Sequence, residues 1–280
     1  MSVLRRLVAC AAIGAVIAGC SQNPAQPAAN PATPTPPAPR ETTRAEAKRF
    51  AEIDAEKKVE RSRIHTELAG GYLERGNLAV ALQEANEALK GNPEYAPAYG
   101  VLGLIYMQLR DEEKAEASFR RGLKVAPDDP DLNNNYGFYL CTRKREKEGI
   151  ERFLIAVKNP LYKTPDRAWT NAGRCSLQRN DTAAAEDFFK TALRLNPVQL
   201  ESLYNLGTIN YNRGNLVEAK TYVTQLVRVM TPPNAEALWL GLRVERKLGD
   251  RNAEASYAAQ LRRSYPEARE TLLMQAGRYE

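Results

Sequence analysis

Cysteine and histidine are the side chains of this sequence best suited to chemistry, and there are few of them. The 280 residues include four cysteines and one histidine, His65. A single imidazole cannot form the histidine sets of zinc sites, and the sequence holds no HExxH segment, no cysteine pair at metal-ligand spacing and no glycine-rich phosphate loop. His65 falls at a position typical of packing between helices, and the carboxylates are spread over amphipathic segments. We therefore expect no enzyme, no catalytic residues, no metal and no cofactor.

The sequence around Cys20 predicts export and lipidation. Two arginines precede an apolar stretch over residues 7–17, which is too short to span a bilayer stably. The following Ala18-Gly19-Cys20 resembles a bacterial lipobox, so we expect a lipoprotein signal peptide over residues 1–19 and acylation of Cys20. The alternative is an ordinary signal peptide that happens to contain a cysteine. By resemblance to sorted lipoproteins, serine rather than aspartate at position 21 favours a lipid anchor in the outer membrane.

Residues 20–43 are expected to form an extended, disordered tether. Seven prolines fall among Ala, Thr, Asn and Gln between Gln22 and Arg40, a composition that cannot pack a core. At about 3.1 Å per residue, this segment could hold a domain up to about 60 Å from a lipid surface. The folded part would then face the periplasm, and the net charge of +6 would fall by two with the arginines of the signal peptide. We therefore expect no nucleic-acid partner.

The remaining residues, 44–280, repeat with a period near 34. Pro93 and Pro127 are 34 residues apart, as are Ala81 and Ala115. Small residues let paired helices approach closely, and proline stops the second helix of each pair. The pattern resembles the tetratricopeptide repeat and predicts an all-α fold, a right-handed α-solenoid with a concave binding surface. The expected elements are a helical lead-in over 44–61, repeats over 62–95, 96–129, 130–165, 166–199, 200–234 and 235–265, and a capping helix within 266–280.

Two of the cysteines, Cys141 and Cys175, occupy the first helices of repeats three and four. They are 34 residues apart, and first helices of adjacent repeats are parallel neighbours in a solenoid. In an oxidising periplasm, thiols placed in this way would form a disulfide that clamps the two repeats together. The alternative is a pair of free thiols that pack in the core.

The working surface is expected to be the concave face lined by the first helices. Asn135, Asn171 and Asn205 share one repeat position, and an amide can both donate to and accept from the backbone of an extended partner. The alternative is that these amides bridge helices. In the first two repeats the inward positions are more apolar and suggest a groove for a hydrophobic segment, although the same residues could simply fill the core. They are Gly70, Leu73, Gly100, Leu104 and Met107.

The chain resembles the PilF/PilW family of type IV pilus biogenesis lipoproteins from Cys20 onward. Four stretches beyond the generic repeat carry the resemblance: NNNYGFYLC at 133–141, NPLYKTP at 159–165, NAGRC at 171–175 and QLRRSYP at 260–266. The family implies a monomer that binds the type IV pilus secretin, a PilQ-like protein, and promotes its outer-membrane localisation and multimerisation as a pilotin. It also implies a disulfide between Cys141 and Cys175, and a contact region in the early repeats.

Two other functions remain open on the sequence. One is a tetratricopeptide lipoprotein of the outer-membrane β-barrel assembly machinery, which would share the lipid anchor and the repeats. The other is a cell-wall enzyme or its activator. An enzyme of that kind would need hydrolytic residues that the sequence does not offer.

Overall fold

The computed structural model describes residues 43–279 of the chain. The predicted signal peptide, the lipidation site Cys20 and nearly all of the predicted tether lie outside the described residues. Contacts divide the chain into two units, residues 1–47 and 48–280. In the first unit the description covers only residues 43–47, where a helix begins, so the fold below is that of the second unit.

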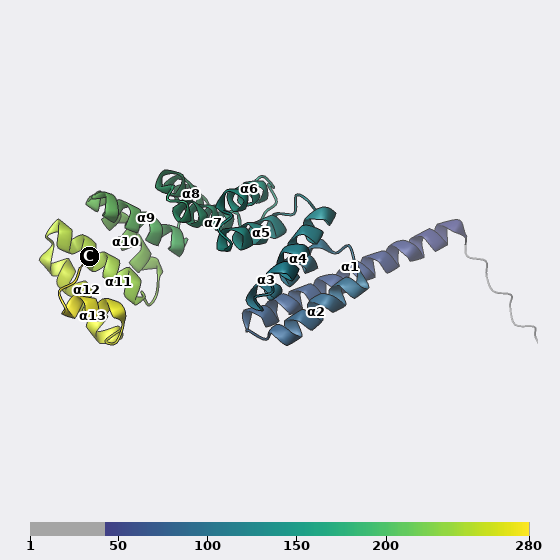
Figure 1. The fold of residues 1–280 in the computed structure, drawn as a ribbon, viewed down its shortest axis with the longest axis horizontal. Helices are drawn as coiled ribbons and strands as arrows, with labels where there is room; N and C mark the ends of the chain where they lie inside the picture. Colours follow the sequence, from purple (N-terminus) through teal and green to yellow (C-terminus); the bar gives the residue numbers. More distant parts are fainter. Residues whose placement is uncertain (1–42, 280) are drawn as a thin grey trace, which may run out of the picture. The chain divides into compact units, whose positions relative to one another are not determined.

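Residues 43–279 contain thirteen α-helices and no strand. Twelve of the helices succeed one another as antiparallel pairs, each joined by a short turn (Figure 1). The helices are α1 (Arg44–Glu74), α2 (Leu78–Gly91), α3 (Ala96–Gln108), α4 (Glu112–Val125), α5 (Pro130–Thr142), α6 (Glu146–Ala156), α7 (Pro165–Gln178), α8 (Thr182–Leu195), α9 (Leu200–Arg213), α10 (Leu216–Val229), α11 (Ala235–Leu248), α12 (Arg251–Ser264) and α13 (Arg269–Gln275). The all-α prediction is therefore confirmed.

The six helix pairs follow the six predicted repeats, with two differences in where helices begin. The first helix, α1, starts at Arg44, so the predicted lead-in and the first helix of repeat one are a single helix of 31 residues. The residues of α1 before Ser62 are exposed. The fourth pair starts at Pro165, because proline suits the first turn of a helix, where its missing N–H is not needed. None of the described helices combines the length and apolar character needed to cross a bilayer.

Short polar side chains set the helix starts. Asp181 is typical: its carboxylate accepts a hydrogen bond from the backbone N–H of Ala184 at 3.1 Å and so satisfies one of the free donors at the start of α8. Asn or Asp side chains make the same bond at Asn77, Asp111, Asp129, Asn234 and Asp250. These capping residues define where their helices begin.

One residue with positive φ reverses the chain inside each repeat. In repeats one, five and six this residue is a glycine, for example Gly214 with φ 87°. In repeats two, three and four it is Arg110, Lys144 and Asn180, with φ near 60°. A side chain in this left-handed conformation costs about 1 kcal/mol. The repeats therefore share a turn geometry even where the sequence lacks the expected glycine.

Within each pair, a small residue on the first helix faces a large residue 16 positions later on the second. At Gly173 an added Cβ atom would lie 2.6 Å from the ring of Phe189, which is fully buried. We call this small residue the reference residue of the repeat. The facing pairs are Gly103 with Phe119, Gly137 with Phe153, Gly173 with Phe189, Gly207 with Val223 and Gly241 with Tyr257, and in repeat one Ala69 and Ala85 stand at the same places.

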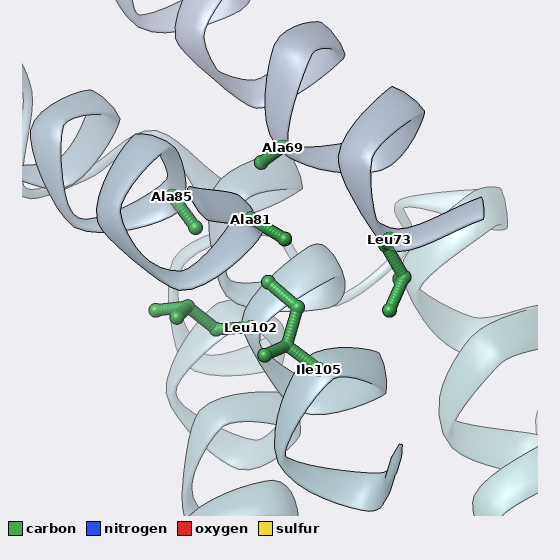
Figure 2. Packing of buried hydrophobic residues seen from close by; sticks show 6 residues of the cluster. All are labelled: Ala69, Leu73, Ala81, Ala85, Leu102 and Ile105. Carbon is green, nitrogen blue, oxygen red and sulfur yellow. The ribbon is translucent and has the colours of Figure 1, made fainter. Parts of the chain in front are cut away.

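The hydrophobic core consists of clusters, and each boundary between consecutive repeats is crossed by one of them. Figure 2 shows its first part, where Ala69 and Leu73 of α1 and Ala81 and Ala85 of α2 pack against α3 of the next repeat. The α3 side chains in this cluster are Leu102 and Ile105, both buried. A single repeat leaves an apolar face open, so each repeat depends on its neighbour for burial. At the other end, Met274 of α13 is buried against repeat six and so covers its open face.

Buried or half-buried acids join consecutive repeats by ion pairs. Glu186 of α8 contacts Arg213 of α9 at 2.8 Å, between repeats four and five. Lys220 of α10 contacts the buried Glu245 of α11 at 2.8 Å, between repeats five and six. Between repeats two and three, Glu116 contacts Arg145, also at 2.8 Å.

The end of repeat three differs from the ends of the other repeats. Helix α6 has 11 residues, whereas each of the other five second helices has 14. Tyr162 follows in the connection to α7, is 7% exposed and packs against Ala156 and Ala168. Its ring occupies the core position left by the shortened helix, so the longer connection is firmly anchored.

Candidate functional site

The reference residues give a register in which the first helices can be compared. Two positions before the reference residue, α5, α7 and α9 carry the three predicted amides Asn135, Asn171 and Asn205. The same position holds Glu67 in repeat one, Val101 in repeat two and Trp239 in repeat six. The amides are therefore confined to the middle of the array, on equivalent faces of three successive first helices.

A cavity of about 320 Å³ lies over α5 and α7. Asn135 and Asn171 both line it, together with Leu104 of α3, Asn134 and Phe138 of α5 and Arg174 of α7. A second cavity, of about 480 Å³, lies over α9. It is lined by Arg174, Leu200, Glu201, Tyr204, Asn205 and Met230.

The two cavities are neighbours because Arg174 and Glu201 line both. Their side chains meet across repeats four and five, with Arg174 Nε 3.1 Å from Glu201 Oε1. Both side chains are about 40% exposed, so water screens this pair and it contributes little to stability. We refer to the two cavities together as the asparagine groove, a surface that joins all three predicted asparagines.

The asparagine groove combines polar and apolar chemistry. The Arg174 guanidinium lies 5.6 Å from the centre of the Phe138 ring, within the range of a cation–π contact. Leu200, Tyr204 and Met230 supply apolar surface beside the amide of Asn205. Burial and the nearby Glu236 carboxylate raise the pKa of Tyr204, so its hydroxyl is a neutral donor and acceptor. Such a groove suits an extended segment with a polar backbone and apolar side chains.

The asparagines also make hydrogen bonds inside the protein. The Asn171 amide donates to Asn134 Oδ1 at 3.0 Å and so links repeats three and four. The Asn205 amide donates to the backbone carbonyl of Glu201 at 2.7 Å, within its own helix. The alternative role as helix-bridging amides is thus present at Asn171, while all three side chains remain at the groove wall.

The five residues predicted in the first two repeats do not share one surface. Leu104 lines the asparagine groove, and Gly70 lies at a half-buried position where an added Cβ would meet nothing within 4 Å. Gly100 is buried, with Leu132 of the next repeat 3.2 Å from the place of its missing Cβ. Leu73, 9% exposed, lies in the core, and Met107 packs against the cluster of Phe119 and Tyr139.

The repeat register explains why Leu73 and Met107 do not form a groove. Both lie four positions after the reference residue of their repeat. A side chain at this position faces the first helix of the next repeat, at the residue two positions after that repeat's reference residue. Leu73 accordingly meets Ile105 in the core of repeats one and two. These two side chains therefore pack between repeats, as the core-filling alternative describes, and a role for them in binding a partner stays a prediction.

Cys141 lies four positions after the reference residue of repeat three, and Cys175 lies two positions after that of repeat four. Leu73 and Ile105 hold the same two positions in repeats one and two. The structure joins Cys141 and Cys175 in a disulfide between α5 and α7, with their Cα atoms 5.7 Å apart. Both cysteines are at least nine-tenths buried. Phe138, Asn171 and Arg174 line both the first cavity of the groove and the small space against this disulfide. The disulfide thus lies directly beneath the groove.

His65 has a structural contact. Its Nδ1 lies 2.6 Å from Glu84 Oε2, so it joins α1 to α2 as the predicted packing residue does. It also borders a hollow of about 560 Å³, but every residue lining that hollow belongs to α1, so no second element encloses a ligand. Within residues 43–279, no three His, Cys, Asp or Glu side chains come together as a metal site.

Phe138, Arg174 and Tyr204 also line the asparagine groove but were not predicted from the sequence. Phe138 and Arg174 follow Asn135 and Asn171 by three residues, and residues three apart share a helix face. Both side chains could therefore have been predicted as the residues three positions after the two asparagines. Tyr204 directly precedes Asn205 and reaches the groove because the second cavity opens between α9 and the residues that lead into α11.

Comparisons with known proteins agree with this architecture. Tetratricopeptide-repeat family models match residues 72–134, 147–199 and 183–235. The chain is 32% identical over 202 residues to the type IV pilus assembly protein PilF of Pseudomonas aeruginosa, which covers 72% of this chain and 80% of that protein. The solved structure of PilW, described as a widely conserved type IV pilus biogenesis factor, has a TM-score of 0.68 and 32% identity, over 76% of this chain and 98% of PilW. The solved Pseudomonas aeruginosa PilF has a TM-score of 0.71 and 31% identity, over 79% of this chain and 99% of PilF.

Proposed function

The chain belongs to the PilF/PilW family of tetratricopeptide-repeat proteins, and from this membership we propose that it is a scaffold protein of type IV pilus biogenesis. In this role it has no enzymatic activity. It binds the type IV pilus secretin, a PilQ-like protein, and promotes the localisation and multimerisation of the secretin at the outer membrane. The lipid on Cys20 would hold the complex at that membrane, with the repeats facing the periplasm.

The observation that carries this proposal is the asparagine groove. Its amides, together with Leu200, Tyr204 and Met230, offer the mixture of hydrogen bonds and apolar contacts that an extended protein segment needs. A chaperone for an aggregation-prone secretin subunit needs to bind that subunit non-covalently and needs no catalysis. The alternative, a lipoprotein of the β-barrel assembly machinery, would use the same groove for a different partner.

Co-purification from cells tests the proposal. Epitope-tagged full-length chain is recovered from detergent-solubilised membranes of its own organism, and the type IV pilus secretin is measured in the eluate. We expect the secretin to co-purify with the wild-type chain. The double variant Arg174→Ala/Asn205→Ala should bind the secretin about 30-fold more weakly and recover correspondingly less of it, because two polar contacts of about 1 kcal/mol each are lost.

A matched control changes the same kinds of side chain on another surface. Thr224→Ala/Arg228→Ala removes one polar and one cationic side chain from α10, away from the asparagine groove, and should leave the yield of secretin unchanged. Recovery of a β-barrel assembly protein in place of the secretin would contradict the proposal and favour the alternative. An equal loss of secretin yield in both double variants would show that the groove residues have only a structural role.

A further inference from the structure

Four of the five turns that connect one repeat to the next carry a single proline followed by one exposed residue, and these exposed residues differ in chemistry. In three of them the sequence is Asn-Pro followed by one exposed residue, which we call the turn tip. The backbone N–H of the tip donates to the Asn side chain at 3.1 Å for Glu94, 2.9 Å for Leu161 and 3.2 Å for Val198. In repeat two the same place is held by Asp128, in the sequence Ala126-Pro127-Asp128.

The tips of repeats one and two are acidic, whereas those of repeats three and four are apolar. Leu161 is 85% exposed and Val198 is 55% exposed. The geometry of the turn explains why a tip is exposed, but it does not explain an apolar side chain there, since Glu94 and Asp128 fit the same position. Leu161 and Val198 therefore meet a requirement that the fold itself does not impose.

Both apolar tips are held rigidly. The backbone N–H of Tyr162 donates to the carbonyl of Asn159 at 3.1 Å, and Gln199 makes the equivalent bond to Asn196, also at 3.1 Å. Directly after Leu161, the Tyr162 ring is buried in the core. A partner that contacts these tips would lose little of its binding free energy to ordering them.

The turn of repeat four leads straight into the asparagine groove. Leu200, two residues after Val198, lines the second cavity beside Tyr204 and Met230. Gln199 lines the first cavity, and so does Arg167, which follows the turn of repeat three. The Val198 tip thus lies two residues from the apolar wall of the groove, and the Leu161 tip lies six residues from Arg167 at the groove wall.

Positive charge surrounds the Leu161 tip. Lys158, Lys163 and Arg167 are exposed, and none of them forms an ion pair within residues 43–279. Two carboxylates lie close by, those of Asp131 and Asp166, and the Asp166 carboxylate accepts a hydrogen bond from Asn196 at 2.8 Å. The local balance favours a partner surface that carries carboxylates beside an apolar cavity.

We propose that Leu161 and Val198 form a docking edge that receives an apolar segment of the secretin subunit flanked by carboxylates, while the same subunit extends into the asparagine groove. This inference rests on the proposed function and adds to it the place and chemistry of the contact. A protein partner is favoured over a bilayer because two separate aliphatic side chains on rigid turns bury too little apolar surface to hold a lipid interface.

Three single substitutions that each add one negative charge test the docking edge. Affinity for the purified type IV pilus secretin in detergent is measured with the full-length chain carrying Leu161→Asp, Val198→Asp or Val217→Asp. Aspartate suits the tips because Asp128 already occupies the equivalent place. Val217, on α10, is 73% exposed and lies outside the proposed edge, so it serves as the matched control. We expect affinity to fall about tenfold or more for Leu161→Asp and about fivefold for Val198→Asp, with less than a twofold change for the control.

The outcomes separate this inference from the proposed function. Absence of secretin binding by the wild-type chain would overturn the proposed function. Wild-type binding that persists unchanged in both tip variants would overturn the docking edge alone. Vesicles of phosphatidylethanolamine and phosphatidylglycerol, and light scattering of the chain by itself, are measured with the Cys20→Ala chain. If the tip substitutions lower vesicle binding or self-association while secretin affinity holds, the edge contacts lipid or a second copy and the inference fails.

Discussion

The absence of a side chain at Gly173 sets how closely α7 approaches α8. The Phe189 ring fills the place where a Cβ atom would lie, and an aromatic ring does the same at the reference residues of repeats two, three and six, whereas in repeat five a Val223 methyl group lies 3.1 Å from that place. Close packing of this kind leaves no space for even one methyl group. A residue that looks like a neutral choice in the sequence is thus a strict steric requirement.

Gly173→Ala is expected to lower the free energy of unfolding by about 2 kcal/mol, because the new methyl group must displace the Phe189 ring or push the two helices apart. Urea denaturation followed by circular dichroism measures the change. Gly70→Ala is the control: it is also a glycine within a helix, but an added Cβ there meets nothing within 4 Å. That variant should be slightly more stable than the wild type, since alanine is the better helix former. Equal destabilisation in both variants would refute the steric argument.

Single residues of the site were partly readable from the sequence. The shared repeat position of Asn135, Asn171 and Asn205 was visible because it needs only the period. For Leu73 and Met107 the sequence left groove lining and core packing equally open, because a small helix rotation turns an inward position into one between repeats. The tips Leu161 and Val198 gave no signal of exposure, since a lone aliphatic residue in a turn reads equally well as core.

At the scale of the helices, an ion pair between α8 and α9 ties repeat four to repeat five. Hydrogen bonds from Lys190 and Arg213 lower the pKa of the Glu186 carboxyl, while partial burial opposes this shift. A lowered pKa in the folded state means that the pair stabilises the fold fully above the ordinary glutamate pKa. That stabilisation is lost as the pH falls through the lowered pKa. The Glu186 carboxyl therefore makes this boundary sensitive to acid.

Glu186→Gln should cost about 1 kcal/mol of stability at pH 7, and this cost should shrink as the pH is lowered through the depressed pKa of the Glu186 carboxyl, because the wild-type group then becomes protonated. Thermal unfolding of both proteins across this pH range checks the expectation. Asp187→Asn is the control, because Asp187 is the exposed neighbour on α8 and makes no ion pair in the described part of the chain. A stability difference that stays constant with pH would show that packing, rather than charge, is responsible.

The helices themselves were largely predictable because the period of 34 and the prolines at repeat ends report on local structure. Three features were not. The continuity of α1 through Arg44–Glu74 depends on the absence of a breaker over 31 residues rather than on any positive signal. The early end of α6 depends on Tyr162 filling the core from outside the helix. Turn propensities do not predict that Arg110, Lys144 and Asn180 adopt the left-handed conformation.

At the scale of the whole molecule, the array is a chain of nearest-neighbour interfaces. Repeats two and three are joined by Glu116 and Arg145, three and four by the disulfide, four and five by Glu186 and Arg213, and five and six by Lys220 and Glu245. Each repeat buries its apolar face only against the next. A continuous groove over the first helices of repeats three, four and five therefore requires the two interfaces between these repeats to stay closed.

The proposed role assigns the lipid anchor and the repeats to separate tasks, which makes Cys20→Ala informative. The variant should keep the helical content and unfolding midpoint of the wild type, because Cys20 lies outside the repeats. Secretin multimers should then be depleted from the outer membrane, since the chain no longer carries its acyl chains there. Fractionation of cell membranes followed by immunoblotting of heat-stable secretin multimers provides the measurement. Normal multimers at normal levels would contradict the proposed role of the anchor.

The disulfide between α5 and α7 also determines how the array would respond to pulling. Tension applied along the chain passes directly from Cys141 to Cys175, so the 34-residue separation between them, including all of α6, is shielded from load. At about 3.5 Å per residue, roughly 120 Å of contour length stays locked until the bond is reduced. The repeats before Cys141 and those after Cys175 would unfold under force independently of each other. The part of the groove wall that lies between the two cysteines, including Asn171 and Arg174, would be the last to lose its shape.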